Sequence, residues 1–283
     1  MDALGIETFG IADGEALLSV SESVGWAHGP GDWTTMLRSG IVFGHRITSG
    51  EIVSSTAVFP YGSALATIGM VIVKPAWQGR GLARALMLHA FACLPAPAPL
   101  RMLIATEQGF PLYRRLGFRT VGHVHRAVAA APRLPCSAVI DPRLTPLATS
   151  DVEAIRRLDA DAIGADRGPV LAARLAQGSG VALRGDEGAI VGFGLRVRQR
   201  DLLLAGPVVA ADAVAAAAVV AGLCGGHDGR IRIDVPTGQS EFLGWLRARG
   251  FETADEAPVM ILDGEALPGR RERVFAVANR AFC

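Results

Sequence analysis

The same order of sequence patterns occurs twice along this chain of 283 residues, and this recurrence constrains the fold more than any other feature. Each copy has a β-rich run that contains or precedes a proline, then a helical pattern, then a Gly-Phe pair. The separation of Pro75 from Pro207 equals that of Gly117 from Gly250 within one residue. Because two unrelated segments agree, the spacing indicates an internal duplication. The sequence therefore predicts two copies of one fold, in residues 1–140 and 141–283.

Composition and charge exclude several classes of protein. Hydrophobic residues make up 50% of the chain and charged residues 19%, which allows a buried core and argues against disorder. The 28 basic and 27 acidic residues nearly cancel, so nucleic-acid binding is not expected. The uncharged stretch 213–226 is shorter than the roughly 20 apolar residues of a membrane helix. The four cysteines form no close pairs and no signal-peptide pattern occurs, so a cytoplasmic protein without a membrane partner is predicted.

Helical and β-rich patterns alternate in both copies, which predicts an α/β (α+β) fold. Gly69 interrupts the long β-rich run 64–73 and predicts either a bulge or a close backbone approach. In the first copy the other expected elements are helices at 13–24, 33–38, 82–94 and 110–116, and strands at 41–47, 51–59, 100–106 and 118–128. A further strand is expected within 271–282, where it could pair with the first copy.

The segment with the clearest chemistry lies between the strand that ends near Pro75 and the helix that begins at Leu82. Two glycines, Gly79 and Gly81, allow the backbone to approach a ligand closely just before the helix. Unpaired N–H groups and the helix dipole make such a position an anion site. Arg80 and Arg84 would add positive charge for further phosphates.

Three phosphate-binding motifs share glycines with this loop. A P-loop needs Lys and Ser or Thr after its last glycine, and none follows Gly81. A dinucleotide fingerprint needs a third small residue where Arg84 stands and an acidic residue about 20 positions later, which is missing. The pattern Q/R-x-x-G-x-G/A, which holds the pyrophosphate of coenzyme A, fits Gln78 to Ala83 at each fixed position. The alternative is an ordinary strand–loop–helix joint with capping glycines.

On this loop and on Leu112 to Phe118, with its Tyr and Leu-Gly-Phe, residues 1–128 resemble the GNAT superfamily of acyl-CoA N-acyltransferases. The resemblance implies two GNAT-like domains, each with a mixed, mostly antiparallel sheet flanked by helices. It implies acetyl-CoA as co-substrate and no metal. The strand Met70–Val73 would pair with the pantetheine amides, and a bulge at Gly69 would make room for them. The residues expected to bind the coenzyme are Val71, Ile72, Val73, Gln78, Gly79, Arg80, Gly81, Leu82, Ala83 and Arg84.

Tyr113 is the expected catalytic acid, because a phenol can protonate the leaving thiolate; the alternative is a ring that only packs. The general base stays open among His28, Asp32, Glu51 and Glu107. The loop GWAHGPGDW is the expected acceptor site, through Trp26, His28, Asp32 and Trp33, although two tryptophans that merely pack the loop are an equal alternative. His123 and His125 would share one face of a strand, but without a third ligand no metal site is expected.

The second copy has lost the motif. When it is aligned on Pro207, residues 210–215 replace the glycine loop, and Asp212 stands where the first copy has Arg80. Leu246 stands where the first copy has Tyr113. A carboxylate would repel a pyrophosphate, so the second copy is expected to bind no coenzyme and to wall the acceptor cleft or dock the first copy.

The sequence thus predicts a tandem GNAT protein whose first copy transfers an acetyl group from acetyl-CoA to an amine, either a small molecule or an amino-acid-like acceptor. Two alternatives stay open, namely a non-catalytic acyl-CoA-binding regulatory module and a structural adaptor that binds no coenzyme. No charge run points to a class of acceptor or to an oligomeric state.

Overall fold

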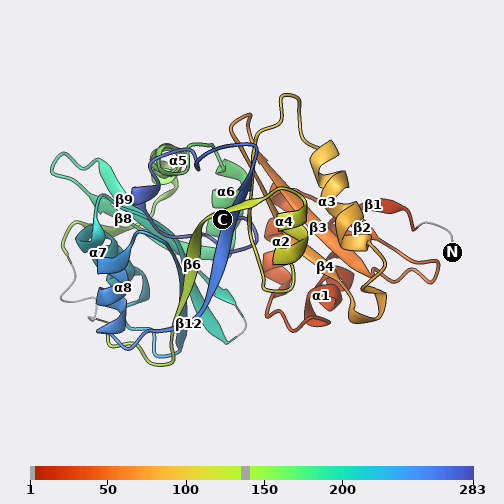
Figure 1. Cartoon of the computed structure of the whole chain (residues 1–283). Helices are drawn as coiled ribbons and strands as arrows, with labels where there is room; N and C mark the ends of the chain where they lie inside the picture. The colour runs from red at the N-terminus through yellow and green to blue at the C-terminus, as the bar shows by residue number, and fades with distance from the viewer. Residues whose placement is uncertain (1–3, 135–140, 200) are drawn as a thin grey trace.

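The computed structural model describes residues 4–134, 141–199 and 201–283, so the predicted domain boundary at residue 140 lies outside the described residues. The first half forms the orange and yellow part of Figure 1. Its elements follow one another as β1 (Ile6–Phe9), α1 (Gly14–Glu22), α2 (Pro30–Ser39), β2 (Ile41–His45), β3 (Ser54–Tyr61), β4 (Leu65–Val73), α3 (Leu82–Ala92), β5 (Leu100–Ile104), α4 (Phe110–Arg115) and β6 (Arg119–Ala129).

The second half repeats the same order of strands and helices, which confirms the predicted duplication. Its elements are β7 (Leu144–Pro146), α5 (Val152–Ile163), α6 (Gly168–Gln177), β8 (Gly178–Arg184), β9 (Ile190–Gln199), β10 (Leu202–Val209), α7 (Ala213–Cys224), β11 (Arg230–Pro236), α8 (Ser240–Arg247) and β12 (Glu252–Leu262), followed by the additional strand β13 (Val274–Ala276).

The two halves share one continuous sheet because they exchange their last strands. The strand order is β1-β2-β3-β4-β5-β12-β6-β11-β10-β9-β8-β7, with β13 beside β10. Strand β12 of the second half therefore lies between β5 and β6 of the first, and β6 lies between β12 and β11 (Figure 1). Most neighbouring strands are antiparallel, whereas β4 with β5 and β10 with β11 are parallel. The predicted fold class is confirmed, and the exchange of strands is an addition to it.

The pairing of the two Gly-Phe segments is confirmed at the level of hydrogen bonds. Phe118 N donates to Tyr113 O at 3.0 Å after α4, and Phe251 N donates to Leu246 O at 3.2 Å after α8. Both turns need a glycine with positive φ, which is 94° at Gly117 and 87° at Gly250. Leu246 therefore does occupy the position of Tyr113.

The pairing of Pro75 with Pro207 is wrong. Pro75 begins a short 3₁₀ helix (Pro75–Trp77) after β4, whereas Pro207 lies inside β10. At Pro207 the register between β10 and β9 shifts. Because proline has no backbone N–H to donate, it is tolerated at such an irregular position of a strand. The equal spacing of the two prolines was a coincidence, although the duplication itself is real.

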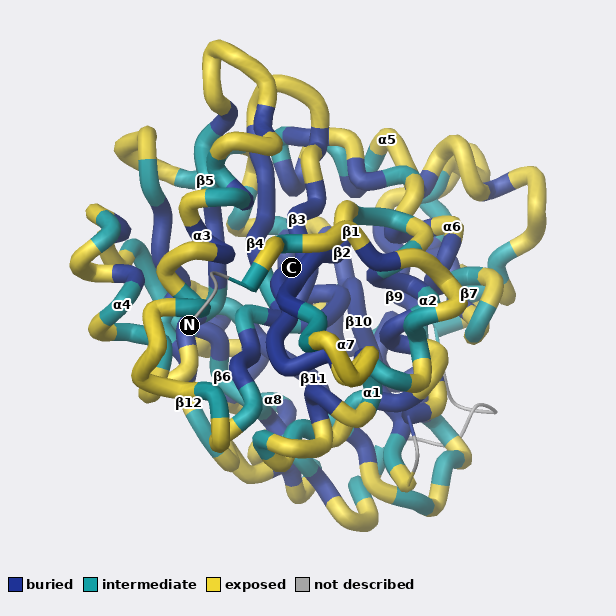
Figure 2. The backbone as a smooth tube through the Cα atoms, turned by 90° about the vertical axis from the view of Figure 1, so that its right-hand side faces the viewer, coloured by how far each residue is buried: buried dark blue, intermediate teal, exposed yellow. Residues whose placement is uncertain are grey.

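The hydrophobic core joins the halves as well as filling them. One cluster of buried side chains contains residues of the first half, such as Trp33 and Met70, together with Phe193 and Phe282 of the second. Two further clusters lie beneath α7 and α8 and beneath α3 and α4. Figure 2 shows the end of the chain lying in dark blue, buried tube between the strands.

The expectation of a strand within 271–282 is met only in part. Residues Arg271–Arg273 form a 3₁₀ helix, and β13 is three residues long. β13 pairs with β10 of the second half and not with the first half, which corrects the expected partner. The residues after β13 do reach the first half, since Tyr61 Oη donates to Phe282 O at 2.8 Å.

The apolar stretch 213–226 is helix α7, which is buried along one side and exposed at Val214, and the turn after it. Among the described residues, no helix has both the length and the apolar character needed to cross a bilayer.

The exchange of strands predicts that neither half folds alone. Residues 1–134 without β12 would expose the unpaired edges of β5 and β6 and lose part of the shared core. We expect this fragment to show no cooperative thermal transition by circular dichroism. Co-expression with residues 141–283 should restore a complex with one cooperative transition. A monomeric fragment 1–134 that unfolds cooperatively would contradict the account.

Candidate functional site

A cavity of about 490 Å³ opens in the first half between β4, the loop before α3, and α4. The predicted residues that line it are Trp26, Val71, Ile72, Val73, Gln78, Gly79, Gly81, Leu82, Ala83, Arg84 and Tyr113. Val24, Trp77, Thr106, Gln108, Gly109, Leu112 and Arg115 complete the lining. The glycine loop before α3 and the C-terminal end of β4 therefore line the same cavity.

Among the described residues, no strand pairs with the cavity-facing edge of β4 beyond Thr67. β4 and β5 are paired only from Leu65 to Thr67. The register with β3 shifts between Ser55 and Ala57, and Met70 next to Gly69 has φ of 53°. This bulge confirms the expected irregularity at Gly69. Because the two parallel strands separate beyond it, an extended ligand can pair with the backbone of Val71 to Val73.

The loop before α3 and the first turn of this helix line the cavity, and the first N–H groups of a helix have no partner within it. Gly79 and Gly81 have φ of 75° and 78°, a conformation that favours glycine. A Cβ atom at either glycine would meet nothing within 4 Å, so backbone conformation and not crowding within the chain accounts for these glycines. Gly81 is the N-cap of α3 and offers no side chain to the first-turn amides. An anion in the cavity can therefore accept from these amides.

Two of the predicted binding side chains have other contacts. Gln78 Nε2 donates to Val73 O at 3.0 Å, so this side chain ties the loop to the end of β4. Arg80 stacks on the Trp77 ring, with its guanidinium carbon 4.5 Å from the ring centroid, and donates to Ala76 O at 3.2 Å. Arg80 is absent from the cavity lining, so its expected contact with the coenzyme stays a prediction.

Positive charge at the cavity comes from two other arginines. Arg84 and Arg115 are exposed and both line the cavity. Arg115 was missed because a charged residue in a short helix has no distinguishing sequence pattern. Its position two residues after Tyr113 is the only available clue, since both residues belong to α4.

Tyr113 lies in the cavity wall with 7% of its surface exposed. It begins the last turn of α4, and its ring packs against Phe118 at 6.1 Å between centroids. Burial raises the pKa of the Tyr113 phenol above its ordinary value of 10.0. The phenol is therefore protonated over the whole physiological pH range. Its ring both packs against Phe118 and lines the cavity.

The predicted acceptor loop divides into two parts. Trp26 lines the cavity, whereas His28, Asp32 and Trp33 do not. Trp33 is buried in the core, and its Nε1 donates to Ser21 Oγ at 3.2 Å.

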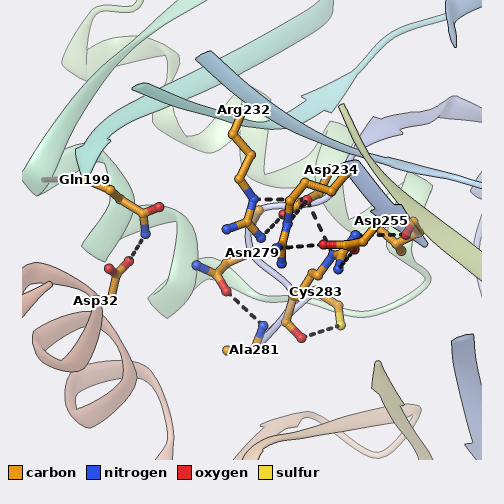
Figure 3. A network of polar contacts seen from close by, with 12 residues as sticks. Asp32, Gln199, Arg232, Asp234, Asp255, Asn279, Ala281 and Cys283 are labelled. Atoms are coloured by element: carbon orange, nitrogen blue, oxygen red, sulfur yellow. Dashed lines mark hydrogen bonds and ion pairs between the residues drawn. The ribbon is translucent and has the colours of Figure 1, made fainter. Parts of the chain in front are cut away.

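Asp32 is buried at the junction with the second half. Gly29 N donates to Asp32 Oδ2 at 2.9 Å, which caps α2, and Gln199 Nε2 donates to Asp32 Oδ1, as Figure 3 shows. Arg174 Nη1 lies 3.9 Å from Asp32 Oδ1. Asp32 and Trp33 thus make buried structural contacts and lie outside the cavity lining where the acceptor was expected.

The other candidate bases also lie outside the cavity lining. Glu51 pairs with Lys74 at 2.8 Å, Glu107 is exposed, and the His28 ring packs near Trp26 with 5.7 Å between centroids. Among the described residues that line the cavity, the ionisable side chains are Arg84, Arg115 and Tyr113.

His123 and His125 do share one face of β6, as predicted. Their Nδ1 atoms lie 3.3 and 3.5 Å from the carboxylate of Glu256 on β12. Within the described residues, no group of three or more His, Cys, Asp or Glu side chains is arranged to hold a metal ion.

The second half has no equivalent of the glycine loop. Residues 210–212 connect β10 to α7, whereas residues 74–81 connect β4 to α3. Asp212 is the N-cap of α7 and its carboxylate accepts from Ala215 N at 2.8 Å. Asp212 thus takes the place of Gly81, not of Arg80 as the alignment on Pro207 suggested. The chain's own carboxylate occupies the anion position there.

Comparison with known proteins now identifies the family. Models of the acetyltransferase (GNAT) domain match residues 40–120 and 155–276. The chain is 30% identical to the protein named Uncharacterized N-acetyltransferase YitH of Bacillus subtilis over 268 residues, which covers 94% of each chain. The chain belongs to the GNAT acetyltransferase family. Because both halves match a GNAT domain, it is a tandem GNAT protein, and the family supports acyl transfer as its activity.

Solved structures share the fold of the whole chain. A protein from Pyrococcus horikoshii described as an acetyltransferase has a TM-score of 0.82 at 18% identity, covering 100% of this chain and 97% of that one. A tandem GNAT protein from the clavulanic acid biosynthesis pathway has a TM-score of 0.64 at 14% identity, covering 93% of this chain and all of that one. These similarities extend across both halves.

The contacts of Asp32 predict a role in stability and not in ligand binding. Asp32→Ala should lower the free energy of unfolding by about 2–4 kcal/mol, because it removes a helix cap and leaves buried donors without an acceptor. Urea denaturation measures this change. The shift in melting temperature on adding coenzyme A should equal that of the wild type. Loss of the shift without loss of stability would return Asp32 to the binding site.

Proposed function

We propose that the first half catalyses transfer of an acetyl group from acetyl-CoA to the nitrogen of a small-molecule or amino-acid-like amine. The observation that carries this proposal is the meeting of three features in one cavity. These are the open edge of β4, the uncapped N-terminus of α3 with its glycine loop, and the buried phenol of Tyr113. Family membership supports acyl transfer, and the cavity supports the coenzyme and the half that uses it.

The cavity residues suit the parts of a coenzyme A molecule. The amides at Gly79 and at the start of α3 would accept the pyrophosphate, with Arg84 and Arg115 adding charge at the exposed rim. The free edge of Val71 to Val73 would pair with the amide groups of the pantetheine arm. Val73 O already accepts from Gln78 Nε2, so the loop and the strand edge hold one another in register.

The transfer needs few groups from the protein. The amine nitrogen attacks the thioester carbon, the carbon–sulfur bond breaks, and the sulfur takes the proton of Tyr113. The phenolate then recovers a proton from the ammonium-like product nitrogen, directly or through water. Backbone N–H groups on β4 near the bulge would stabilise the negative charge on the thioester oxygen.

Because the ionisable groups lining the described cavity are two arginines and one phenol, the amine should enter as the neutral base. An acceptor whose ammonium pKa is near 8 meets this condition without a general base. The same lack of a carboxylate or imidazole is also what a non-catalytic acyl-CoA-binding module would show, and this is the second candidate function. Release of free thiol from acetyl-CoA with a panel of small amines separates the two.

Substitution of Tyr113 tests the catalytic proposal. Tyr113→Phe should lower kcat by about 10²-fold, because a general acid contributes 10²–10⁴-fold, while the Kd of acetyl-CoA stays the same. Free-thiol assays and calorimetry measure the two quantities. An unchanged kcat would remove Tyr113 from the mechanism.

The raised pKa of Tyr113 fixes the form of the pH profile. The protonated phenol is the acid and persists as pH rises, whereas the acceptor amine becomes reactive. Activity should therefore rise as the pH passes through the pKa of the amine and show no alkaline fall below about pH 10.

Substitution of Gly81 by a charged residue tests the position of the pyrophosphate. Gly81→Asp should add a carboxylate beside the first turn of α3, repel the phosphates and weaken coenzyme A binding by about tenfold or more at low salt. Gly81→Asn is the matched control, because Asn tolerates the same positive φ without a charge. Equal Kd values for the two variants would place the pyrophosphate elsewhere.

A further inference from the structure

The C-terminal segment, residues 274–283, lies in the second half where the cavity lies in the first. β10 and β11 are paired from Leu202 to Ala205 only, as β4 and β5 are at the equivalent place. Beyond that point β13 pairs with β10 at Val208 and Val209, and Val277 N donates to Asp234 O of β11 at 2.9 Å. β13 therefore fills the gap between the two separating strands.

The C-terminal segment then crosses to the first half and contacts its reacting strand. A Cβ atom on Gly206 of β10 would lie 2.2 Å from Val277 O, and one on Gly69 of β4 would lie 2.1 Å from Ala281 O. Gly69 is thus also the site of the close backbone approach that its sequence position predicted. The two bulged strands meet the same short segment, which contacts one through Val277 and the other through Ala281.

Buried side chains hold the backbone of the C-terminal segment in place. On α6 and at its N-cap, Arg174 Nη2 donates to Ala278 O at 3.2 Å and Arg167 Nη1 donates to Cys283 O. Arg167 is also paired with Asp159 through two hydrogen bonds of 2.7 and 2.8 Å.

Both arginines are fully buried, and burial lowers the pKa of Arg174 to about 10. A buried guanidinium costs stability unless it is paired and hydrogen-bonded. The carbonyl groups of the C-terminal segment are among the partners that these two arginines have.

The segment is also fixed at its turn and at its start. Asn279 Oδ1 accepts from Ala281 N at 2.9 Å, as Figure 3 shows, and Arg280 Nη2 donates to Val124 O of β6 at 3.0 Å. Gln239 Nε2 donates to Val274 O at 3.0 Å. These contacts with both halves hold the C-terminal segment in its observed position.

We propose that the C-terminal segment takes the place of a coenzyme in the second half and positions the reacting strand β4 of the first half. The degenerate copy is then a support for the active copy and not a second binding module. The filled gap is independent of the proposed function, whereas the effect on catalysis rests on it. Tyr61, whose phenol donates to Phe282 O, and Gly69 become positioning residues through this contact.

Hydrogen exchange with and without coenzyme A tests the filled gap. Peptides covering 206–210 and 274–278 should be protected in the free protein and unchanged by saturating coenzyme A. Peptides covering 70–74 should gain protection on binding. Rapid exchange of 274–278 in the free protein, or loss of its protection when coenzyme A is added, would overturn the proposal. Failure of 70–74 to respond would instead count against the proposed coenzyme site.

Loosening the segment tests its effect on catalysis. Tyr61→Phe removes the hydrogen bond to Phe282 O and a longer one of 3.4 Å from Thr67 Oγ1, and it should lower kcat by about fivefold with an unchanged Kd for acetyl-CoA. The matched control is Thr237→Val, which removes side-chain hydrogen bonds to His123 between the halves at another place. Thr237→Val should leave kcat unchanged. Equal kcat values for wild type and Tyr61→Phe, or equal losses in both variants, would show that the segment has only a structural role.

Discussion

The pairing of β12 with β5 is the constraint on which the rest of the structure depends. Strand β12 belongs to the second half, yet it pairs with β5 from Val259 to Leu262, and Ala105 N donates to Pro258 O at 2.8 Å. β5 ends at Ile104, two residues before Thr106, which lines the cavity. The second half therefore fixes one side of the site in the first half. The shared core and the C-terminal segment join the halves at the same junction, so the halves cannot move apart without opening the site.

The two copies of the fold differ at the gap between their separating parallel strands. The gap is open between β4 and β5, and β13 fills it between β10 and β11. In the first half the edge of β4 stays free, a glycine loop exposes amides, and Tyr113 faces the cavity. In the second half β13 covers the edge of β10, Asp212 caps the helix, and Leu246 replaces the tyrosine. Under the proposed function, each change removes a different part of a coenzyme site. The second copy still supplies β12 and the C-terminal segment to the junction with the first.

The sequence predicted features that depend on neighbouring residues and missed those that depend on distant ones. The glycine loop, the bulge at Gly69 and the turn after Tyr113 follow from local backbone requirements, so their positions were correct. The exchange of β6 and β12 depends on pairing between strands far apart in the chain, and local patterns carry no record of it. Asp32 resembled a site residue because its partner Gln199 lies in the other half. Arg80 was placed at the cavity because a motif gives residue types but not the rotamer that stacks on Trp77.

The central claim is that the backbone around Gly79 and Gly81 holds the coenzyme and that the second half holds none. A crystal structure with coenzyme A tests it most directly. We expect one molecule per chain, with its pyrophosphate on the amides at the start of α3 and its pantetheine arm along Val71 to Val73. A coenzyme bound between β10 and β11, with β13 displaced, would contradict it.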